Sequence, residues 1–322
     1  MTSQVSAESW VKVASIASVR IRPRRAAAAK ACAAIVIALV AAVSLAASAR
    51  MASCASAGGR LHEIGAAADA PARPLPKGVS VPRYSPGPMP YHPGQELIYQ
   101  ASWIGIPAAG GKVVLNASHG DPALLIAEIW VNTNRLTDKL YRMRDYLRED
   151  FSASSLKPNE MNIRQNEGRR HDTFNVTFDH RDHVVTLVKH GPRGQQIRKF
   201  LSYNPSGPVS GAMMALSQPL EAGDSLSFDA FSGTTRYVFE LKVIKRERIG
   251  TPLGEFDAFR IVPSVTYLSD GKINDEVHET TLWVSADARR LPLRVESAVF
   301  IGSIRIDLVK VIDDSAARSA ER

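Results

Sequence analysis

The sequence predicts an all-β domain, built as a single large antiparallel barrel or a strongly curved sheet, that follows a signal segment and a disordered linker. Two observations lead to this prediction. From residue 91 onward, short segments of alternating apolar and polar residues follow one another, with turn-forming residues between them and little helical periodicity. The first 90 residues instead hold a basic and then apolar start, followed by a stretch rich in Ala, Gly and Pro.

The alternating segments predict fourteen strands, which are separated by Gly, Pro, Asn, Asp and Ser. They cover residues 95–103, 111–118, 123–131, 141–151, 160–166, 172–179, 184–190, 196–203, 225–231, 235–248, 255–267, 276–286, 291–301 and 303–312. Helix is expected only near residues 134–140 and 209–217. Because long open sheets leave unpaired edges, so many strands must curl on themselves or pair face to face. We expect a barrel or curved sheet first and a sandwich second.

The first 53 residues have the parts of a secretory signal. A basic stretch at 20–30 precedes residues 31–49, which carry no charge and end in the small residues Ala47-Ser48-Ala49. Three outcomes stay open: cleavage after Ala49, retention of the apolar stretch as a membrane anchor, and lipid attachment at Cys54 within Met-Ala-Ser-Cys. All three place the domain outside the cytoplasm, in the periplasm or on the periplasmic face of the outer membrane.

The remaining boundaries follow composition. Residues 54–90 are expected to form a disordered linker, because their content of Ala, Gly and Pro cannot bury enough apolar surface to fold. The folded domain is expected to span 91–313 and to fold without the preceding residues, and 314–322 to form a disordered tail.

Charge and cysteine content exclude several classes of function. The net charge is +8, but residues 1–53 hold seven cations and one anion, so only +2 remains for the rest of the chain. This near-neutral remainder predicts no nucleic-acid partner. Both cysteines, Cys32 and Cys54, precede the domain, which therefore has no disulfide and no cysteine nucleophile.

Catalytic and metal-binding patterns are absent from the sequence. His180 and His183 fall between two expected strands, where a solvated turn explains them better than a metal site does. Asp145, Glu149 and Asp150 alternate with arginines, a pattern more typical of ion pairs on a water-facing side of a sheet than of an acid/base pair. There is no G-x-S-x-G, P-loop or G-x-G-x-x-G pattern. We therefore expect no cofactor, no metal and no enzymatic activity.

Several local motifs resemble an uncharacterised bacterial family known as domain of unknown function 3108. The matching motifs are 91–99 (YHPGQELIY), 103–106 (WIGI), 110–115 (GGKVVL), 141–145 (YRMRD), 219–224 (PLEAGD), 252–259 (PLGEFDAF), 282–292 (LWVSADARRLP) and 301–304 (IGSI). The resemblance implies an exported, β-rich protein of Gram-negative bacteria with no established activity. The sequence departs from the family pattern at Gln95-Glu96, where the acid lies one place later than in many members.

One segment also suggests where a ligand would bind. In residues 235–248 four apolar side chains share one face of the strand, and they are the candidate ligand-lining residues: Tyr237, Phe239, Leu241 and Val243. A barrel can be hollow or filled. We therefore expect a non-catalytic envelope protein that binds an apolar or lipid-like ligand. The first alternative is a structural or partner-binding factor with a packed interior, and the second is an enzyme of unrecognised type. Membrane contact is expected only through the N-terminal segment or a lipid anchor.

Overall fold

The computed structural model describes residues 81–192, 194–202, 204–231, 236–267, 280–299 and 302–313. The signal segment, Cys54, most of the expected linker and the expected tail lie outside these residues. None of the helices in the described ranges is long and apolar enough to cross a membrane.

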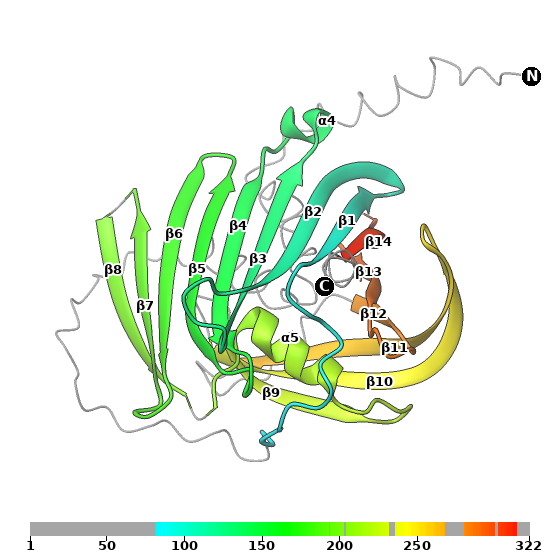
Figure 1. The fold of residues 1–322 in the computed structure, drawn as a ribbon. Helices are drawn as coiled ribbons and strands as arrows, with labels where there is room; N and C mark the ends of the chain where they lie inside the picture. The colour runs from blue at the N-terminus through cyan, green and yellow to red at the C-terminus, as the bar shows by residue number, and fades with distance from the viewer. Residues whose placement is uncertain are drawn as a thin grey trace, which may run out of the picture.

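Fourteen strands form one antiparallel sheet, in which each strand pairs with its neighbours in the order β8-β7-β6-β5-β4-β3-β2-β1-β14-β13-β12-β11-β10-β9 (Figure 1). The strands are β1 (Gln95–Trp103), β2 (Ile106–Ala117), β3 (Leu124–Thr133), β4 (Arg144–Ser152), β5 (Pro158–Glu167), β6 (Arg170–Asp179), β7 (Val184–Gly191), β8 (Gly194–Leu201), β9 (Ser225–Phe231), β10 (Arg236–Thr251), β11 (Gly254–Tyr267), β12 (Thr280–Ser285), β13 (Pro292–Ala298) and β14 (Ser303–Asp313). Apart from the contact of β1 with β14, every pairing joins strands that are consecutive in the sequence.

The sheet is strongly curved and not closed, which confirms the all-β prediction in its curved-sheet form. Strands β8 and β9 stand at the two ends of the strand order. Register shifts interrupt several pairings, for example between Ile98 and Tyr99 and between Val243 and Lys245. An extra residue of this kind bends a strand and increases its twist, so these irregularities help the sheet to curve.

Alternation along the strands places the core on the concave face. In β4 the burial alternates residue by residue along the whole strand, and β3 follows the same rule for most of its length. Inward side chains such as Ile129, Phe151 and Phe174 are almost completely buried. The period of two in the sequence therefore becomes a sheet with one apolar face.

Within the part of the chain that the structure describes, two helices interrupt the strands. The short α4 (Arg135–Asp138) joins β3 to β4, and its N-cap Asn134 accepts a 2.9 Å hydrogen bond from the backbone N–H of Thr137. The longer α5 (Pro208–Ser217) has Gly207 as its N-cap and Pro208 as its first residue. Figure 1 shows α5 lying inside the curve of the sheet, where Val209, Met213 and Leu216 are buried.

Residues 81–90, the last part of the segment that composition assigned to the linker, contact the domain. Tyr84 packs on Phe228 with ring centroids 4.9 Å apart, and its hydroxyl accepts a hydrogen bond from the backbone N–H of Ser227. The backbone N–H of Gly87 donates to the Ser217 hydroxyl at the end of α5. A Cβ atom at Gly87 would lie 2.0 Å from the Ser217 carbonyl oxygen, so this approach requires glycine.

Candidate functional site

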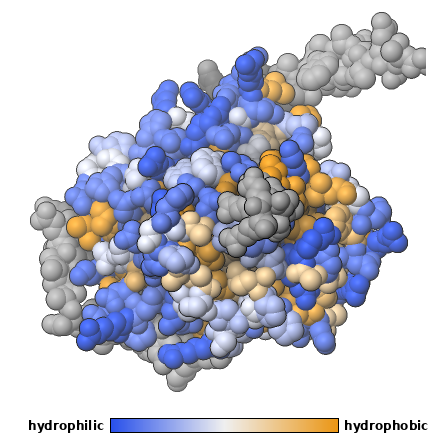
Figure 2. Space-filling view, viewed as in Figure 1, coloured by the Kyte–Doolittle hydropathy of each residue, from blue (hydrophilic) through white to orange (hydrophobic). Residues whose placement is uncertain are grey.

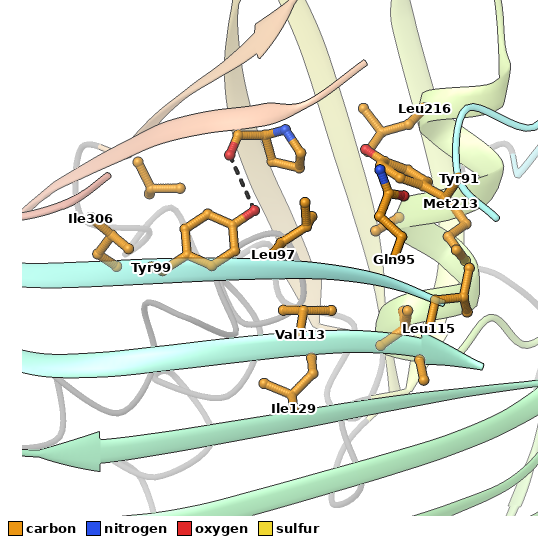
Figure 3. Close-up of a pocket in the computed structure, with 15 residues that line it drawn as sticks. Tyr91, Gln95, Leu97, Tyr99, Val113, Leu115, Ile129, Met213, Leu216 and Ile306 are labelled. Atoms are coloured by element: carbon orange, nitrogen blue, oxygen red, sulfur yellow. Dashed lines mark hydrogen bonds between the residues drawn. The ribbon is translucent and has the colours of Figure 1, made fainter. Parts of the chain in front are cut away.

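An apolar cavity of about 80 Å³ lies between α5 and the inner face of β1, β2 and β3 (Figure 3). Strand β1 contributes Leu97 and Tyr99, and α5 contributes Ala212, Met213 and Leu216. The lining residues also include Val113, Leu115, Ala127, Ile129, Val209, Pro292, Val295 and Ile306. Because a water molecule needs only about 10–15 Å³ measured in this way, the space is several times larger than a packing defect.

Two tyrosines in the cavity wall have their hydroxyl groups occupied. Tyr99 donates to the carbonyl oxygen of Pro292 at 3.2 Å, the dashed line in Figure 3, and Tyr91 donates to the carbonyl oxygen of Arg290 at 2.5 Å. Burial raises the pKa of both phenols above its ordinary value. Both side chains therefore stay uncharged, and no other ionisable side chain lines the cavity.

Gln95 is the one amide in this wall. The residue is only 7% exposed, and its side-chain amide is not among the fully buried unpaired polar atoms of the described residues, so the amide is accessible from the cavity that it lines. Figure 3 shows the side chain of Gln95 among the residues that line the cavity. Gln95 therefore offers both a donor and an acceptor to anything that enters the cavity.

Glu149 fixes the position of α5 beside the cavity. This side chain is 0% exposed, and its carboxylate accepts hydrogen bonds from the backbone N–H groups of Val209 at 2.7 Å and Ser210 at 3.0 Å. The first turn of a helix has unpaired N–H groups and a partial positive charge, so an anion is favourable there. Burial raises the pKa of the Glu149 carboxyl, and the hydrogen bonds from α5 oppose that rise.

The four ligand-lining candidates from the sequence lie on the other side of α5. Phe239, Leu241 and Val243 line a smaller cavity of about 20 Å³. Tyr237, Phe239 and Leu241 line a second cavity of similar volume. Tyr237, Leu241 and Val243 are buried and Lys242 is exposed, as the alternation predicts, but Phe239 is only partly buried and Val238 on the opposite face is also buried. Whether these residues contact a ligand stays a prediction, and the largest of these three cavities is formed by other residues.

The interpretation of the acidic residues in β4 was wrong for two of the three. Asp150 does lie on the outer face, where it pairs with Arg148 at 2.7 Å. Asp145 and Glu149 point inward and are 5% and 0% exposed. They share the buried face of β4 with Leu147 and Phe151, as a period of two requires. The arginines next to them in the sequence belong to the opposite face.

Asp145 forms a buried acid pair with Glu167. The backbone N–H of Asn166 donates to the Asp145 carboxyl at 2.8 Å, and the Tyr141 hydroxyl donates to Glu167 at 2.9 Å. Burial and the neighbouring charge of Glu167 raise the pKa of Asp145 to about 8, so the Asp145 carboxyl favours its protonated form at neutral pH. Neither carboxyl group borders the three cavities around α5.

The histidine pair lies in the turn between β6 and β7, as the sequence predicts. A ring nitrogen of His180 lies 2.6 Å from the carbonyl oxygen of Pro158, and His183 adopts a positive φ of 55°. Within the described residues, no group of three or more His, Cys, Asp or Glu side chains is arranged to hold a metal ion.

Sequence comparison assigns the chain to a family. Residues 98–309 match the family described as "Protein of unknown function (DUF3108)", and the chain belongs to that family. This confirms the resemblance found in the local motifs. No curated protein sequence matches the chain.

Comparison with solved structures gives matches at low identity and with TM-scores under 0.5. A β-barrel-like protein of the domain of unknown function DUF1849 from Brucella abortus is 9% identical, with 71% of this chain and 98% of that chain covered and a TM-score of 0.47. A Bacteroides fragilis protein described as exported, with a YmcC-like fold, is 9% identical over 71% and 100% of the two chains, with a TM-score of 0.28. A protein described as a lipoprotein from Parabacteroides distasonis is 12% identical over 71% and 99%, also with a TM-score of 0.28.

Proposed function

We propose that this protein is a non-catalytic binding protein of the cell envelope, whose main cavity takes up an uncharged apolar molecule or the apolar chain of a lipid. The observation that carries the proposal is the Gln95 amide in an otherwise apolar cavity of about 80 Å³. Ligand sites typically combine apolar walls with a few polar groups that fix orientation. The envelope location rests on the basic and then apolar N-terminal segment.

The chemistry of the wall defines the class of ligand. Because the cavity has no charged side chain, burying an ionised group there would cost several kcal/mol. The Gln95 amide can instead pair with a hydroxyl, ester or amide group. An acyl chain next to an ester or amide linkage fits both features, with any charged headgroup left outside.

Cavities on both sides of α5 would allow an acyl chain longer than the main cavity to enter. The main cavity and the two smaller ones are all bordered by Ala212. Leu216 also borders the main cavity and the first smaller one, so a small displacement of α5 that moves Ala212 and Leu216 would join these spaces. Ala212 is therefore the position at which the binding space can be changed most directly.

Uptake of the uncharged fluorescent probe N-phenyl-1-naphthylamine by the full chain tests the proposal. The parent protein should bind the probe saturably, and Ala212→Leu should strongly reduce binding, because the larger side chain fills the space. The free energy of unfolding of this variant should be unchanged or higher, since filling a void adds contacts. Met214→Leu is the matched control: it changes the same helix at a residue that borders none of the three cavities. Absence of saturable uptake by the parent would favour the structural alternative.

A second variant tests the role of the amide. Gln95→Leu removes the polar group at similar volume. Binding of an acyl ester should therefore weaken by up to about tenfold, which corresponds to the loss of one neutral hydrogen bond. Binding of a plain hydrocarbon chain should be unchanged or tighter. Equal effects on both ligands would show that Gln95 does not contact the ligand.

A further inference from the structure

One rim of the curved sheet is formed by two segments, the turn between β1 and β2 and the helix α4. Asn134, at the start of α4, donates from its backbone N–H to the carbonyl oxygen of Ala108 at 3.0 Å. Its side-chain amide donates to the carbonyl oxygen of Pro107 at 2.6 Å. These bonds hold α4 beside the first residues of β2, so the two segments form one surface, which we call the α4 rim (residues 104–107 and 135–142).

The α4 rim exposes four large aliphatic side chains. They are Ile104 (56% exposed), Ile106 (57%), Leu136 (60%) and Leu140 (82%). Only three other large apolar side chains in the described residues are comparably exposed. Figure 2 shows apolar surface at the upper edge of the molecule, where Figure 1 places α4. Scattered apolar residues on a surface are ordinary, but a cluster indicates a binding surface.

The backbone conformation at the tip of the turn between β1 and β2 is unusual for an isoleucine. Ile104 has a φ of 50°, in the left-handed region, and Gly105 follows with a φ of 77°. A β-branched residue is rare in that region, where Gly, Asn or Asp is less strained. The Ile104 side chain packs in part against Gly302, in the turn between β13 and β14, but more than half of the residue (56%) stays exposed in spite of the strained backbone.

The unpaired charges on the α4 rim are all positive. Arg135, Lys139 and Arg142 are exposed, and none of them forms an ion pair within the described part of the chain. The nearby carboxylate of Asp138 is occupied by Arg144 at 2.6 Å. The rim therefore presents unpaired cations around aliphatic tips.

We propose that the α4 rim docks on the surface of an anionic phospholipid bilayer. Aliphatic tips would enter the boundary between headgroups and acyl chains, and the cations would pair with lipid phosphates. A protein partner fits less well, because protein interfaces are depleted of lysine, whereas anionic membrane surfaces attract it. The exposed residues of the rim hold no aromatic side chain and include Lys139. This contact would add to the membrane contact expected of the N-terminal segment.

The inference does not depend on the proposed ligand, since the α4 rim and the cavity lie at different ends of β1. Tyr99 borders the cavity and Ile104 lies five residues further on, which corresponds to about 16 Å along a strand. A protein with a packed interior could dock in the same way. A negative result for ligand binding therefore does not contradict membrane docking, and a negative result for docking does not contradict ligand binding.

A local fluorescence label tests the docking surface in the full chain. Cys32 and Cys54 are replaced by Ser, Leu140→Cys is introduced, and the environment-sensitive NBD dye is attached to it. Because the label reports only its own surroundings, binding through the N-terminal segment does not mimic the signal. Leu136→Cys provides a second label on the same rim. Ile197→Cys on β8 is the matched control, an aliphatic residue 62% exposed and four strands away from β4.

Vesicles containing phosphatidylglycerol should shift the emission of the rim labels to the blue, and vesicles of phosphatidylcholine alone should do so less. The control label should not respond. Replacing Arg135 and Lys139 by Gln should raise the lipid concentration at half-maximal shift by about fivefold for each cation removed. The proposal is overturned if neither rim label responds to anionic vesicles, or if the control responds equally. It is also overturned if the rim labels shift without vesicles as protein concentration rises, which would indicate docking on a second copy.

Discussion

The buried carboxylate of Glu149 accepts a 3.0 Å hydrogen bond from the backbone N–H of Ser210, which lies 61 residues further along the chain. This contact holds the first turn of α5 against β4 in the interior of the sheet. At the other end of α5, Gly87 and Ser85 hydrogen-bond to Ser217 and Gln218. The helix is thus fixed at both ends, while Ala212 in its middle borders all three cavities.

Glu149→Ala should lower the free energy of unfolding by about 2–5 kcal/mol, because two buried N–H groups of α5 lose their acceptor. Chemical denaturation followed by circular dichroism measures this. Glu160→Ala, at an exposed position of the neighbouring strand, should change stability by no more than about 0.5 kcal/mol. Equal effects of the two substitutions would show that Glu149 does not anchor the helix.

Gly207→Ala should destabilise the protein, because the added Cβ would lie 2.1 Å from Oε1 of Glu149. Relief of that overlap would push α5 away from β4, at a cost of about 1–3 kcal/mol or more. Gly120→Ala is the control, since a Cβ there meets no atom within 4 Å. Melting temperatures of the two variants should therefore differ clearly, and similar values would contradict the contact.

Stability should fall as pH rises from about 5 to 9. The pKa of Asp145 is about 8 in the folded protein and about 3.9 in an unfolded chain, so the folded state binds more protons between these values. Unfolding then releases a proton, and raising the pH favours the unfolded state. Asp145→Asn should flatten this dependence, although the raised pKa of Glu149 acts in the same direction. Thermal melts across this pH range measure the dependence of stability on pH. The same dependence in the variant and the parent would contradict a protonated Asp145 carboxyl in the folded protein.

Residues 91–322 should unfold cooperatively without the preceding segment but with lower stability than a chain that begins at residue 81. The difference should be about 1–3 kcal/mol, the contribution of burying a side chain such as Tyr84 on Phe228. Tyr84→Ala in the longer chain should reproduce most of the loss. A non-cooperative melt of the shorter chain would place the domain boundary before residue 91.

The strands were predictable because their signal is local. Alternation with a period of two and turn residues at each end predicted fourteen strands, and α5 was expected within one residue of its observed start. The same period could have shown that Gln95 shares a face with Leu97 and Tyr99, and that Asp145 and Glu149 share one with Leu147 and Phe151. Polar residues on an otherwise apolar face were the signal for the site.

The location of the cavity was not predictable in this way. It depends on where α5 lies, and that depends on the contact between Glu149 and the first turn of α5, far away in the sequence. A short helix with small residues in its middle could equally have packed on the outside of the sheet. For this reason the sequence pointed to the face of β10 rather than to β1, β2 and β3.

Native mass spectrometry of the protein purified from envelope extract tests the central claim most directly. The account predicts a population heavier than the polypeptide by the mass of one small apolar molecule, which is released on denaturation and is depleted in Ala212→Leu but not in Met214→Leu. A spectrum that contains only the bare polypeptide in the parent, from an extract rich in lipid, would contradict it.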